Sequence, residues 1–355
     1  MGKQATAVTI LPELIRLAVP LLQEAERQCP RSGPGAKPVV PDWVVAAWIM
    51  IVLLAKKKSK SAQYRYLCGR RQDLAAWLGT EAFLARCSYF RRYRRAHRLY
   101  QTAITLQGAQ AVTDGVVHPR HVAVDKSLIE ALGPVWHQRD RQAGEVPAGV
   151  DVDGAWGRSE HDGWVYGYSY EVVVVSTPRQ IVFPLLASVD TASACETQTF
   201  ASKIADLPEA TQTVSADSAY DANHLGEQVE YDDKGRRTGR RFVCPENPRN
   251  NKRPKTKPCA ADASRAQSRR RRLQRRRFRD SARGRRLYAR RKKTAEPFNS
   301  WLKGLFELEQ GVWHRGLDNN RTQLLASIFA YQLLVRYNHR WGHKNACIRW
   351  ILDAL

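Results

Sequence analysis

Three acidic residues have the side-chain type and the positions that metal-assisted phosphodiester chemistry requires. Asp125 ends one apolar stretch, Asp217 ends another, and Glu296 lies farther along the chain in a helical pattern. Carboxylate oxygens are the ligands that Mg²⁺ and Mn²⁺ prefer. Two such ions, about 3.5–4 Å apart, activate an attacking water and stabilise the leaving oxygen of a phosphodiester. The three acids together therefore indicate a site for two divalent cations.

The stretches that carry these acids predict a mixed α/β sheet. Adjacent strands that end side by side would bring Asp125 and Asp217 together, and a helix across the strand ends would supply Glu296. Pro297 follows that glutamate directly, which predicts a kink or a fresh helix start. Lys126 should point away from the site, because neighbouring side chains in a strand face opposite ways. The expected strands are 121–125, 165–176, 180–190, 211–217 and 240–244, and the expected helices after residue 111 include 196–206 and 319–339.

Residues 1–111 predict an all-α region with few strand signals. One segment in it, Tyr89–Tyr100, interleaves arginines with aromatic residues. That pattern favours a DNA-facing helix with guanidinium groups on phosphates and rings over sugars, and its candidate contacts are Arg92, Arg94 and Arg95. A solvated basic face on a structural helix is the alternative. Beyond a first amphipathic stretch, the expected helices are 43–55, 71–84 and 87–111.

The chain is strongly basic, with a formal net charge of +24 over 355 residues. Such an excess indicates a polyanionic partner, either nucleic acid or an anionic membrane surface. The longest apolar run, Trp43–Ala55, is shorter than the roughly 20 residues of a membrane-spanning helix, so we expect a buried core helix there and no membrane partner. Seven widely spaced cysteines without a C-x-x-C pair argue against a disulfide framework and a zinc site, and favour a reducing cytoplasm.

The basic residues are concentrated between Arg265 and Lys293, where 16 of 29 residues are Lys or Arg and Asp280 is the one acid. Such a block repels itself and is expected to stay extended or surface-bound until phosphates neutralise it. These changes in composition suggest the domain boundaries. We expect a helical N-terminal DNA-binding region over 1–111, the first part of a catalytic domain over 112–246, a basic Pro/Arg-rich insertion or loop over 247–282, and C-terminal helices carrying Glu296 over 283–345.

Four short motifs occur in a fixed order around the three acids. They are Val124–Ser127 (VDKS), Trp156–Gly157 followed by Trp164–Tyr168 (WVYGY), Ala216–Asp221 (ADSAYD), and a helix with Tyr288, Arg291, Glu296 and Lys303. In this combination, residues 85–340 resemble the DDE transposases of bacterial insertion sequences, which act by cut and paste. The resemblance implies an RNase H-like catalytic domain, a mixed sheet flanked by helices, preceded here by the all-α region.

By this resemblance Asp125, Asp217 and Glu296 are the catalytic residues and the ligands of two Mg²⁺ or Mn²⁺ ions. The implied activity is that of a DNA transposase, which binds the terminal inverted repeats of a mobile element, cleaves the ends with metal-activated water and joins the 3′-hydroxyl ends to target DNA. The implied partner is double-stranded DNA, bound by a homodimer in the cytoplasm, at the nucleoid of a bacterium. Three alternatives stay open: a metal-dependent DNA nuclease without strand joining, a decayed or repurposed transposase that only binds DNA, and a basic RNA-binding protein.

The resemblance also implies a set of DNA contacts. Arg291 and Lys303 would contact phosphates near the scissile bond, with Tyr288 supporting them. The family spaces its arginine four residues before the glutamate. Here Lys292 holds that position and Arg291 lies one residue earlier, so either cation fits the role. Lys303 lies two helical turns after Glu296, so both face the same way. Further candidate contacts within the basic block are Arg275, Arg276 and Arg277.

Overall fold

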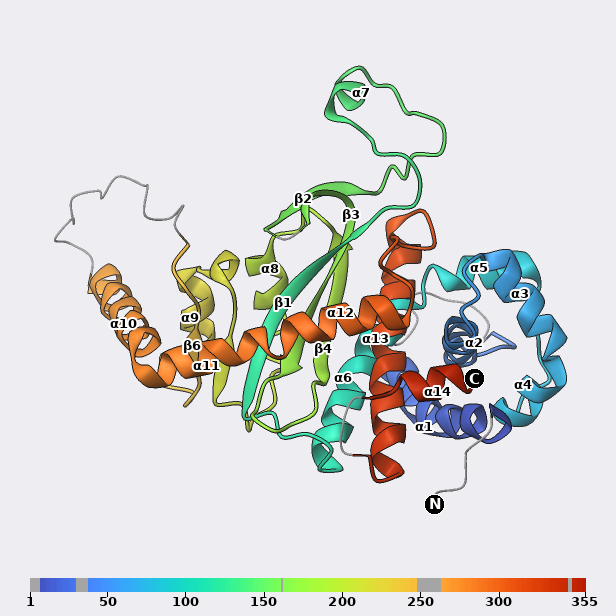
Figure 1. Ribbon diagram of the computed structural model, residues 1–355, viewed down its shortest axis with the longest axis horizontal. Helices are drawn as coiled ribbons and strands as arrows, with labels where there is room; N and C mark the ends of the chain where they lie inside the picture. Colours follow the sequence, from blue (N-terminus) through green and yellow to red (C-terminus); the bar gives the residue numbers. More distant parts are fainter. Residues whose placement is uncertain (1–6, 30–37, 161, 248–262, 344–346) are drawn as a thin grey trace.

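A computed structural model describes residues 7–29, 38–160, 162–247, 263–343 and 347–355 of the chain. It has a mixed α/β sheet flanked by helices, with an all-α region beside it, as the sequence predicts (Figure 1). The helices of that region are α1 (Ala7–Gln28), α2 (Asp42–Leu54), α3 (Lys60–Gly69), α4 (Arg71–Leu78), α5 (Arg86–Tyr93) and α6 (His97–Thr113). The later helices are α7 (Gln138–Gln142), α8 (Glu196–Ala201), α9 (Asn223–Glu230), α10 (Ala263–Asp280), α11 (Ala282–Lys292), α12 (Ala295–Leu305), α13 (Leu317–Arg340) and α14 (Arg349–Asp353), with a 3-10 turn η1 (Ser218–Tyr220).

The sheet has the strand order β2-β3-β1-β5-β6, and β4 also pairs with β3. Its strands are β1 (His121–Glu130), β2 (Ala155–Ser159), β3 (Gly163–Val175), β4 (Pro184–Thr191), β5 (Thr213–Ser215) and β6 (Arg241–Val243). β1 runs antiparallel to β3 and parallel to β5, and β5 runs parallel to β6. The five expected strands are present, whereas β2, which pairs with the first part of β3, was missed by the sequence pattern.

β1 is longer than the sequence predicts, and this changes the position of Asp125. The prediction that Asp125 ends its strand is wrong, because β1 continues to Glu130. Beyond the carboxylate the antiparallel ladder with β3 goes on, and its last pair joins Glu130 to Gly167. Leu128 and Ile129 are buried in this extension, so apolar packing favours continued pairing with the long partner strand.

The helical region has shorter elements than the sequence predicts. The helix expected over 71–84 ends at Leu78, because Gly79 adopts the left-handed conformation, with φ 67°, that commonly terminates helices. The helix expected over 87–111 forms two helices, α5 and α6, separated by a short turn. The run expected as a core helix is confirmed as α2, which is buried from Val44 to Leu54. Among the described residues, no helix is long and apolar enough to span a membrane.

The aromatic rings of the segment Tyr89–Tyr100 face the protein interior. Tyr89, Tyr93 and Tyr100 are almost fully buried, and the Tyr100 hydroxyl donates to the Ala46 carbonyl oxygen at 2.5 Å. The prediction that these rings lie over DNA sugars is therefore wrong. These three rings are spaced to pack into the core, and among the predicted contacts of this segment Arg94 and Arg95 remain exposed to a partner.

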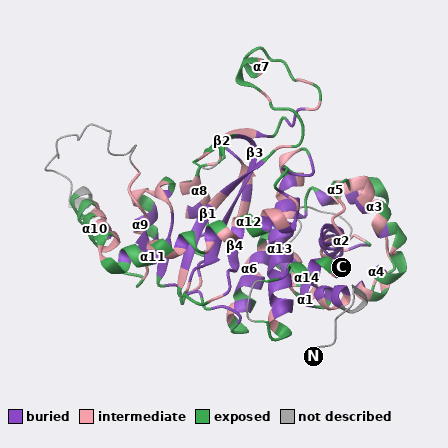
Figure 2. Ribbon diagram, viewed as in Figure 1, coloured by how far each residue is buried: buried purple, intermediate pink, exposed green. Residues whose placement is uncertain are grey.

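α13 joins the helical region to the sheet. Every residue from Thr322 to Asn338 is buried, and contact with β4 confirms the prediction that this helix packs under the sheet. The Gln332 Nε2 donates to the carbonyl oxygens of Ile104 in α6 and Pro184 in β4, at 3.0 and 2.8 Å. Most of the buried apolar side chains form one cluster that runs from the N-terminal helices through α13 to the sheet, and Leu128, Val165 and Ala192 form a small second cluster. Figure 2 shows buried residues along α2, α13 and the strands. The helical region and the sheet therefore share one core.

Candidate active site

The register of β1 against β5 places Asp125 and Asp217 side by side. The two strands are parallel, and Ala123 pairs with Ser215. Each aspartate lies two residues beyond its member of that pair, so both carboxylates leave the chain at the same level of the sheet. β5 ends at Ser215, and the Asp217 Oδ1 accepts a hydrogen bond from the Ala219 backbone nitrogen at 2.9 Å. That bond caps the turn η1 and fixes the direction of the second carboxylate.

The guanidinium group of Arg291 lies between the two carboxylates. Its Nη2 donates to the Asp125 Oδ1 at 2.5 Å and to the Asp217 Oδ2 at 3.3 Å. Arg291 comes from α11, which crosses one face of the sheet and contacts β1 and β5 (Figure 1). The arginine is only 6% exposed. The two aspartates therefore share one buried cation.

The break between α11 and α12 gives a second group access to Asp125. α12 begins afresh at Ala295 with Thr294 as its N-cap, which confirms the prediction of a fresh helix start at Pro297. The proline lies in the first turn, where its missing N–H costs no helical hydrogen bond. One turn later Asn299 donates from its Nδ2 to the Asp125 Oδ2 at 2.7 Å. Both oxygens of Asp125 are thus held, one from each helix.

Glu296 lies at the rim of this arrangement. It is exposed in the first turn of α12, where a negative charge is favourable near the helix N-terminus. Its charge contributes to raising the pKa of Asp125 and also that of the half-buried Tyr288. Burial is the larger cause for the pKa of Tyr288, and Asp217 adds to it. The tyrosine, the glutamate and the two aspartates are therefore within electrostatic reach of one another.

The burial of the two aspartates disfavours their ionised forms. Desolvation raises the pKa of Asp125 from 3.8 to about 6, while Arg291 opposes the rise and the charges of Asp217 and Glu296 add to it. Desolvation likewise raises the pKa of Asp217, and Arg291 and the Ala219 backbone nitrogen oppose this rise. A pair of carboxylates in this environment gains from a positive charge placed between them. The site is therefore electrostatically suited to binding a cation.

The raised pKa of Asp125 predicts a stability that falls as pH rises. Between pH 3.8 and 6 the Asp125 carboxyl is ionised in the unfolded chain but still protonated in the folded chain. The free energy of unfolding therefore decreases as the pH rises through this range. The loss over this window is on the order of 3 kcal/mol. Asp125→Asn is expected to remove that decline. Denaturant unfolding from pH 4 to 7 measures the free energy of unfolding of the unsubstituted chain and of Asp125→Asn. If this free energy changes with pH in the same way for both proteins, the prediction is wrong.

The other lysines considered near the three acids are bound elsewhere or at least partly exposed. Lys126 points away as predicted, and its Nζ donates to the Ala192 and Ala194 carbonyl oxygens at 3.0 and 2.6 Å. Lys292 is exposed at the end of α11, and Lys303 is half-exposed on α12. Of the two cations that fit the arginine role, Arg291 is the one that the structure brings to the aspartates.

The three arginines predicted as DNA contacts in the helical region differ in their surroundings. Arg92 is engaged within the protein, where its Nε donates to the Asp42 Oδ1 at 2.9 Å. Arg94 and Arg95 are exposed. Arg94 lines a surface pocket of about 580 Å³ beside Arg315, between the helical region and the start of α13. The exposed pair is thus available to an external anion, whereas Arg92 holds α5 to α2.

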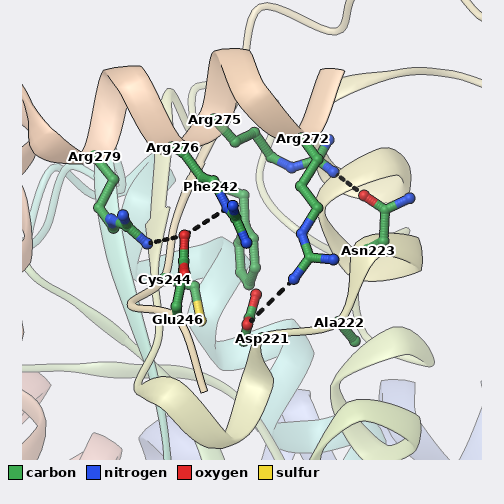
Figure 3. A pocket seen from close by; sticks show the side chains of 10 residues that line it. All are labelled: Asp221, Ala222, Asn223, Phe242, Cys244, Glu246, Arg272, Arg275, Arg276 and Arg279. Carbon is green, nitrogen blue, oxygen red and sulfur yellow. Dashed lines mark hydrogen bonds and ion pairs between the residues drawn. The ribbon is translucent and has the colours of Figure 1, made fainter. Parts of the chain in front are cut away.

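Within the part expected as an extended or surface-bound loop over 247–282, the described residues from Ala263 to Asp280 form the helix α10, so the prediction of an extended loop is wrong there, and residues 248–262 lie outside the described residues. The helix α11 agrees with the helices expected from residue 283 onward. One face of α10 lies against acidic residues near β6 and α9, around a small pocket of about 30 Å³ (Figure 3). Arg275 pairs with Glu227 at 3.4 Å, and Arg276 pairs with Glu246 at 2.5 Å. These acids neutralise the repulsion that would otherwise keep the segment unfolded. The arginines with such acidic partners, called the inner face below, are Arg271, Arg272, Arg275, Arg276 and Arg279.

The opposite side of the same segment presents cations to solvent. Arg277 is exposed two residues after the buried Arg275, as expected for a helix with two distinct faces. Among the predicted contacts of this segment, Arg277 is therefore outward-facing, and Arg275 and Arg276 are inward-facing. The exposed cations of α10, α11 and the turn after α11, called the outer basic face below, are Arg269, Arg270, Arg277, Arg283, Arg285, Arg286, Lys292 and Lys293.

Other acids close to the site in sequence have structural roles. Glu171 forms a buried ion pair with Lys203 at 2.7 Å, and the Tyr220 hydroxyl donates to it at 2.9 Å. Asp151 is buried and accepts a hydrogen bond from the Gly316 backbone nitrogen at 3.0 Å, immediately before α13. Asp151 lies in a loop before β2. Its partner lies far along the chain, and no local signal points to it.

Divalent cations fit the donor chemistry of this site. Asp125 and Asp217 present hard carboxylate oxygens that already converge on one positive charge, that of Arg291. Within the part of the chain that the structure describes, no three His, Cys, Asp or Glu side chains are grouped closely enough to hold a metal ion. The structure therefore assembles the pair of aspartates, and Glu296 stands apart from it at the rim.

Comparison with known proteins gives one match. A family model described as Transposase DDE domain matches residues 117–333, more than half of the chain, and this span contains all three acids. The DDE domain has an RNase H-like fold, in agreement with the mixed sheet flanked by helices. No match was found among curated proteins or solved structures.

Proposed function

The chain belongs to the transposase DDE domain family, and on that premise we propose that it cleaves the ends of a mobile DNA element and joins them to target DNA at the site of Asp125, Asp217 and Glu296. The observation that carries the proposal is the convergence of the two aspartates on one cation, with Arg291 Nη2 at 2.5 and 3.3 Å from their oxygens. Such a pair is of little use to a protein that only binds DNA, because buried carboxylates repel phosphate.

Divalent cations held by the three acids would supply the Lewis acidity that activates the attacking water or 3′-hydroxyl and stabilises the leaving oxygen. The residues of the chain contribute the rest. The buried walls around Asp125 exclude bulk water and keep the local dielectric low. Arg291 and Asn299 hold the two oxygens of Asp125 in a fixed orientation. Lys303 and Tyr288 are proposed to bind the phosphate next to the scissile bond.

The partner is proposed to be double-stranded DNA with inverted repeats at the element's ends. The outer basic face offers eight exposed guanidinium and ammonium groups on α10, α11 and the turn after α11, a chemistry suited to a phosphate backbone. Arg94 and Arg95 offer a second basic surface on the helical region. Because transposition handles two ends, we propose that two chains assemble on DNA, one for each end.

A cleavage and joining assay tests this proposal. Sequence on either side of the gene supplies the inverted repeats for a donor DNA, which is incubated with the purified chain, Mg²⁺ and a target plasmid. We expect strand cuts at the repeat ends, followed by transfer of the 3′-hydroxyl ends into the plasmid. Removal of divalent cations by a chelator is expected to stop both steps.

A metal-dependent nuclease without strand joining is the alternative that the same acids allow. Pre-cut ends separate the two, because joining then needs no prior cleavage. If the chain cuts donor DNA but never joins pre-cut ends to the plasmid, the nuclease function is correct. If it binds the repeats and neither cuts nor joins, the chain is a DNA-binding protein and the proposal fails.

A further inference from the structure

Asn299 contacts Asp125, the proposed metal ligand, from a position that the sequence motifs do not include. It lies in α12 three residues after Glu296, so the two side chains leave the same side of the helix. Its Nδ2 donates to the Asp125 Oδ2 at 2.7 Å, while Arg291 holds the Oδ1 at 2.5 Å. The carboxylate is buried, so these two donors determine how it is turned.

The other end of the Asn299 amide has no partner. Its Oδ1 is buried and accepts no hydrogen bond from any described residue. Leaving a buried acceptor unpaired is unfavourable. Turning the amide over would place this oxygen against a carboxylate oxygen of Asp125, so the carboxylate fixes the observed orientation. An apolar side chain at position 299 would avoid the free-energy cost of the unpaired oxygen. The presence of an amide there indicates that its hydrogen bond to Asp125 serves a purpose.

We propose that Asn299 is a positioning residue of the cation site, which acts by orienting Asp125 for a divalent cation. The proposal rests on the proposed function, since it assumes that Asp125 is a metal ligand. Groups that hydrogen-bond a ligating carboxylate orient it, and their loss weakens metal affinity. The amide of Asn299 is neutral, so it orients the carboxylate without competing for its charge. Arg291 differs in this respect, because it brings a positive charge of its own.

Binding of Mn²⁺ to the full chain without DNA tests the proposal by titration calorimetry. Asn299→Ala and Asn299→Leu are expected to weaken Mn²⁺ affinity about 10–100-fold. Their thermal unfolding midpoints without metal should change little, because the substitutions remove the unpaired Oδ1 and also take the donor from the Asp125 Oδ2, which are opposing effects. The matched control is Ser300→Ala on the same helix, where the side chain is exposed and affinity should not change.

The outcomes separate this inference from the function on which it rests. If Asn299→Leu binds Mn²⁺ as the unsubstituted chain does but unfolds more easily, the residue is structural and the inference is wrong. If Asn299→Ala unfolds, Asn299→Leu fills the position and decides the same question. If the unsubstituted chain and Asp125→Asn bind Mn²⁺ equally, Asp125 is not a ligand and the proposed function itself is wrong. In cleavage assays, the Mg²⁺ concentration for half-maximal rate should rise more than the maximal rate falls.

Discussion

Replacing Asp125 or Asp217 by asparagine is expected to slow DNA strand cleavage more than about a hundredfold, beyond the 10–100-fold typical of residues that only support a metal ligand. The amide keeps the shape of the side chain but loses the charge that a divalent cation requires. Binding to element ends should stay equal or strengthen slightly, because removing a negative charge reduces repulsion of phosphate. Glu296→Gln is expected to behave in the same way.

Single-turnover cleavage and end binding, measured on the same preparations at one salt concentration, check this prediction. Asp206→Asn is a suitable control, because Asp206 is an exposed acid outside the site. A double variant of Asp125 and Asp217 that still cuts DNA would remove these residues from the chemistry. Glu296→Gln that cuts normally would show that the rim glutamate is not the third ligand, and it would leave the pair of aspartates as the core of the site.

DNA binding is expected to weaken steeply with salt. For contact with about 6–10 phosphates, affinity should fall by on the order of 10³–10⁵ between 50 and 200 mM salt. The outer basic face offers eight exposed cations for such contacts. Each Arg→Ala substitution there should reduce the slope of log affinity against log salt by about 1, and should do so for any DNA sequence. Fluorescence anisotropy over a salt series measures this slope.

Arg277→Ala and Arg275→Ala form a matched pair for this prediction. Both residues lie on α10, but Arg277 is exposed and Arg275 is buried against Glu227. Arg277→Ala should lower the salt slope and leave unfolding unchanged. Arg275→Ala should lower the thermal unfolding midpoint, because it removes a buried guanidinium group that pairs with Glu227 and donates to the Asn223 side chain. A flat salt response, or equal slopes for both variants, would mean that this segment does not bind DNA.

The sequence predicts the two aspartates better than their setting. Both were located from apolar stretches that end in a carboxylate, a local signal that strand formation produces. Asp125 and Asp217 are aligned by the register between β1 and β5. That register cannot be read from the sequence of either strand alone. The extension of β1 to Glu130 is likewise imposed by the long partner β3. Strand pairing decides what a single-strand pattern leaves open.

The basic segment shows the limit of reasoning from charge alone. Counted by itself, its charge density predicts an extended chain. The acids that allow α10 to fold against the protein, Glu227 and Glu246, lie well before it in the sequence. The prediction that the tyrosines between Tyr89 and Tyr100 contact DNA is wrong for a related reason. Aromatic rings pack into a core as readily as against DNA, and these rings are buried. Composition indicates the partner class, and tertiary contacts decide which side chains face it.

Asn299 is the residue for which a signal existed in the sequence. It follows Glu296 by three residues, the spacing that places two side chains on the same face of a helix. Reading the polar residues one turn on either side of a predicted ligand would have found it. The choice between Arg291 and Lys292 needed the structure, because the packing of α11 against β1 and β5 decides which of the two cations reaches the aspartates.

The shared core has a consequence for how the protein is made. α6 and β4 leave the ribosome long before α13, the helix that packs against them. Because translation proceeds at about 5–20 residues per second, their apolar faces stay uncovered for roughly 10–40 s. During this interval the nascent chain depends on chaperones or on its own speed of collapse. Glu296 and the two aspartates, which are proposed as the catalytic residues, are also translated before α13, which contacts α12. A message truncated before residue 317 would therefore yield an unstable product, because the shared core would lack α13.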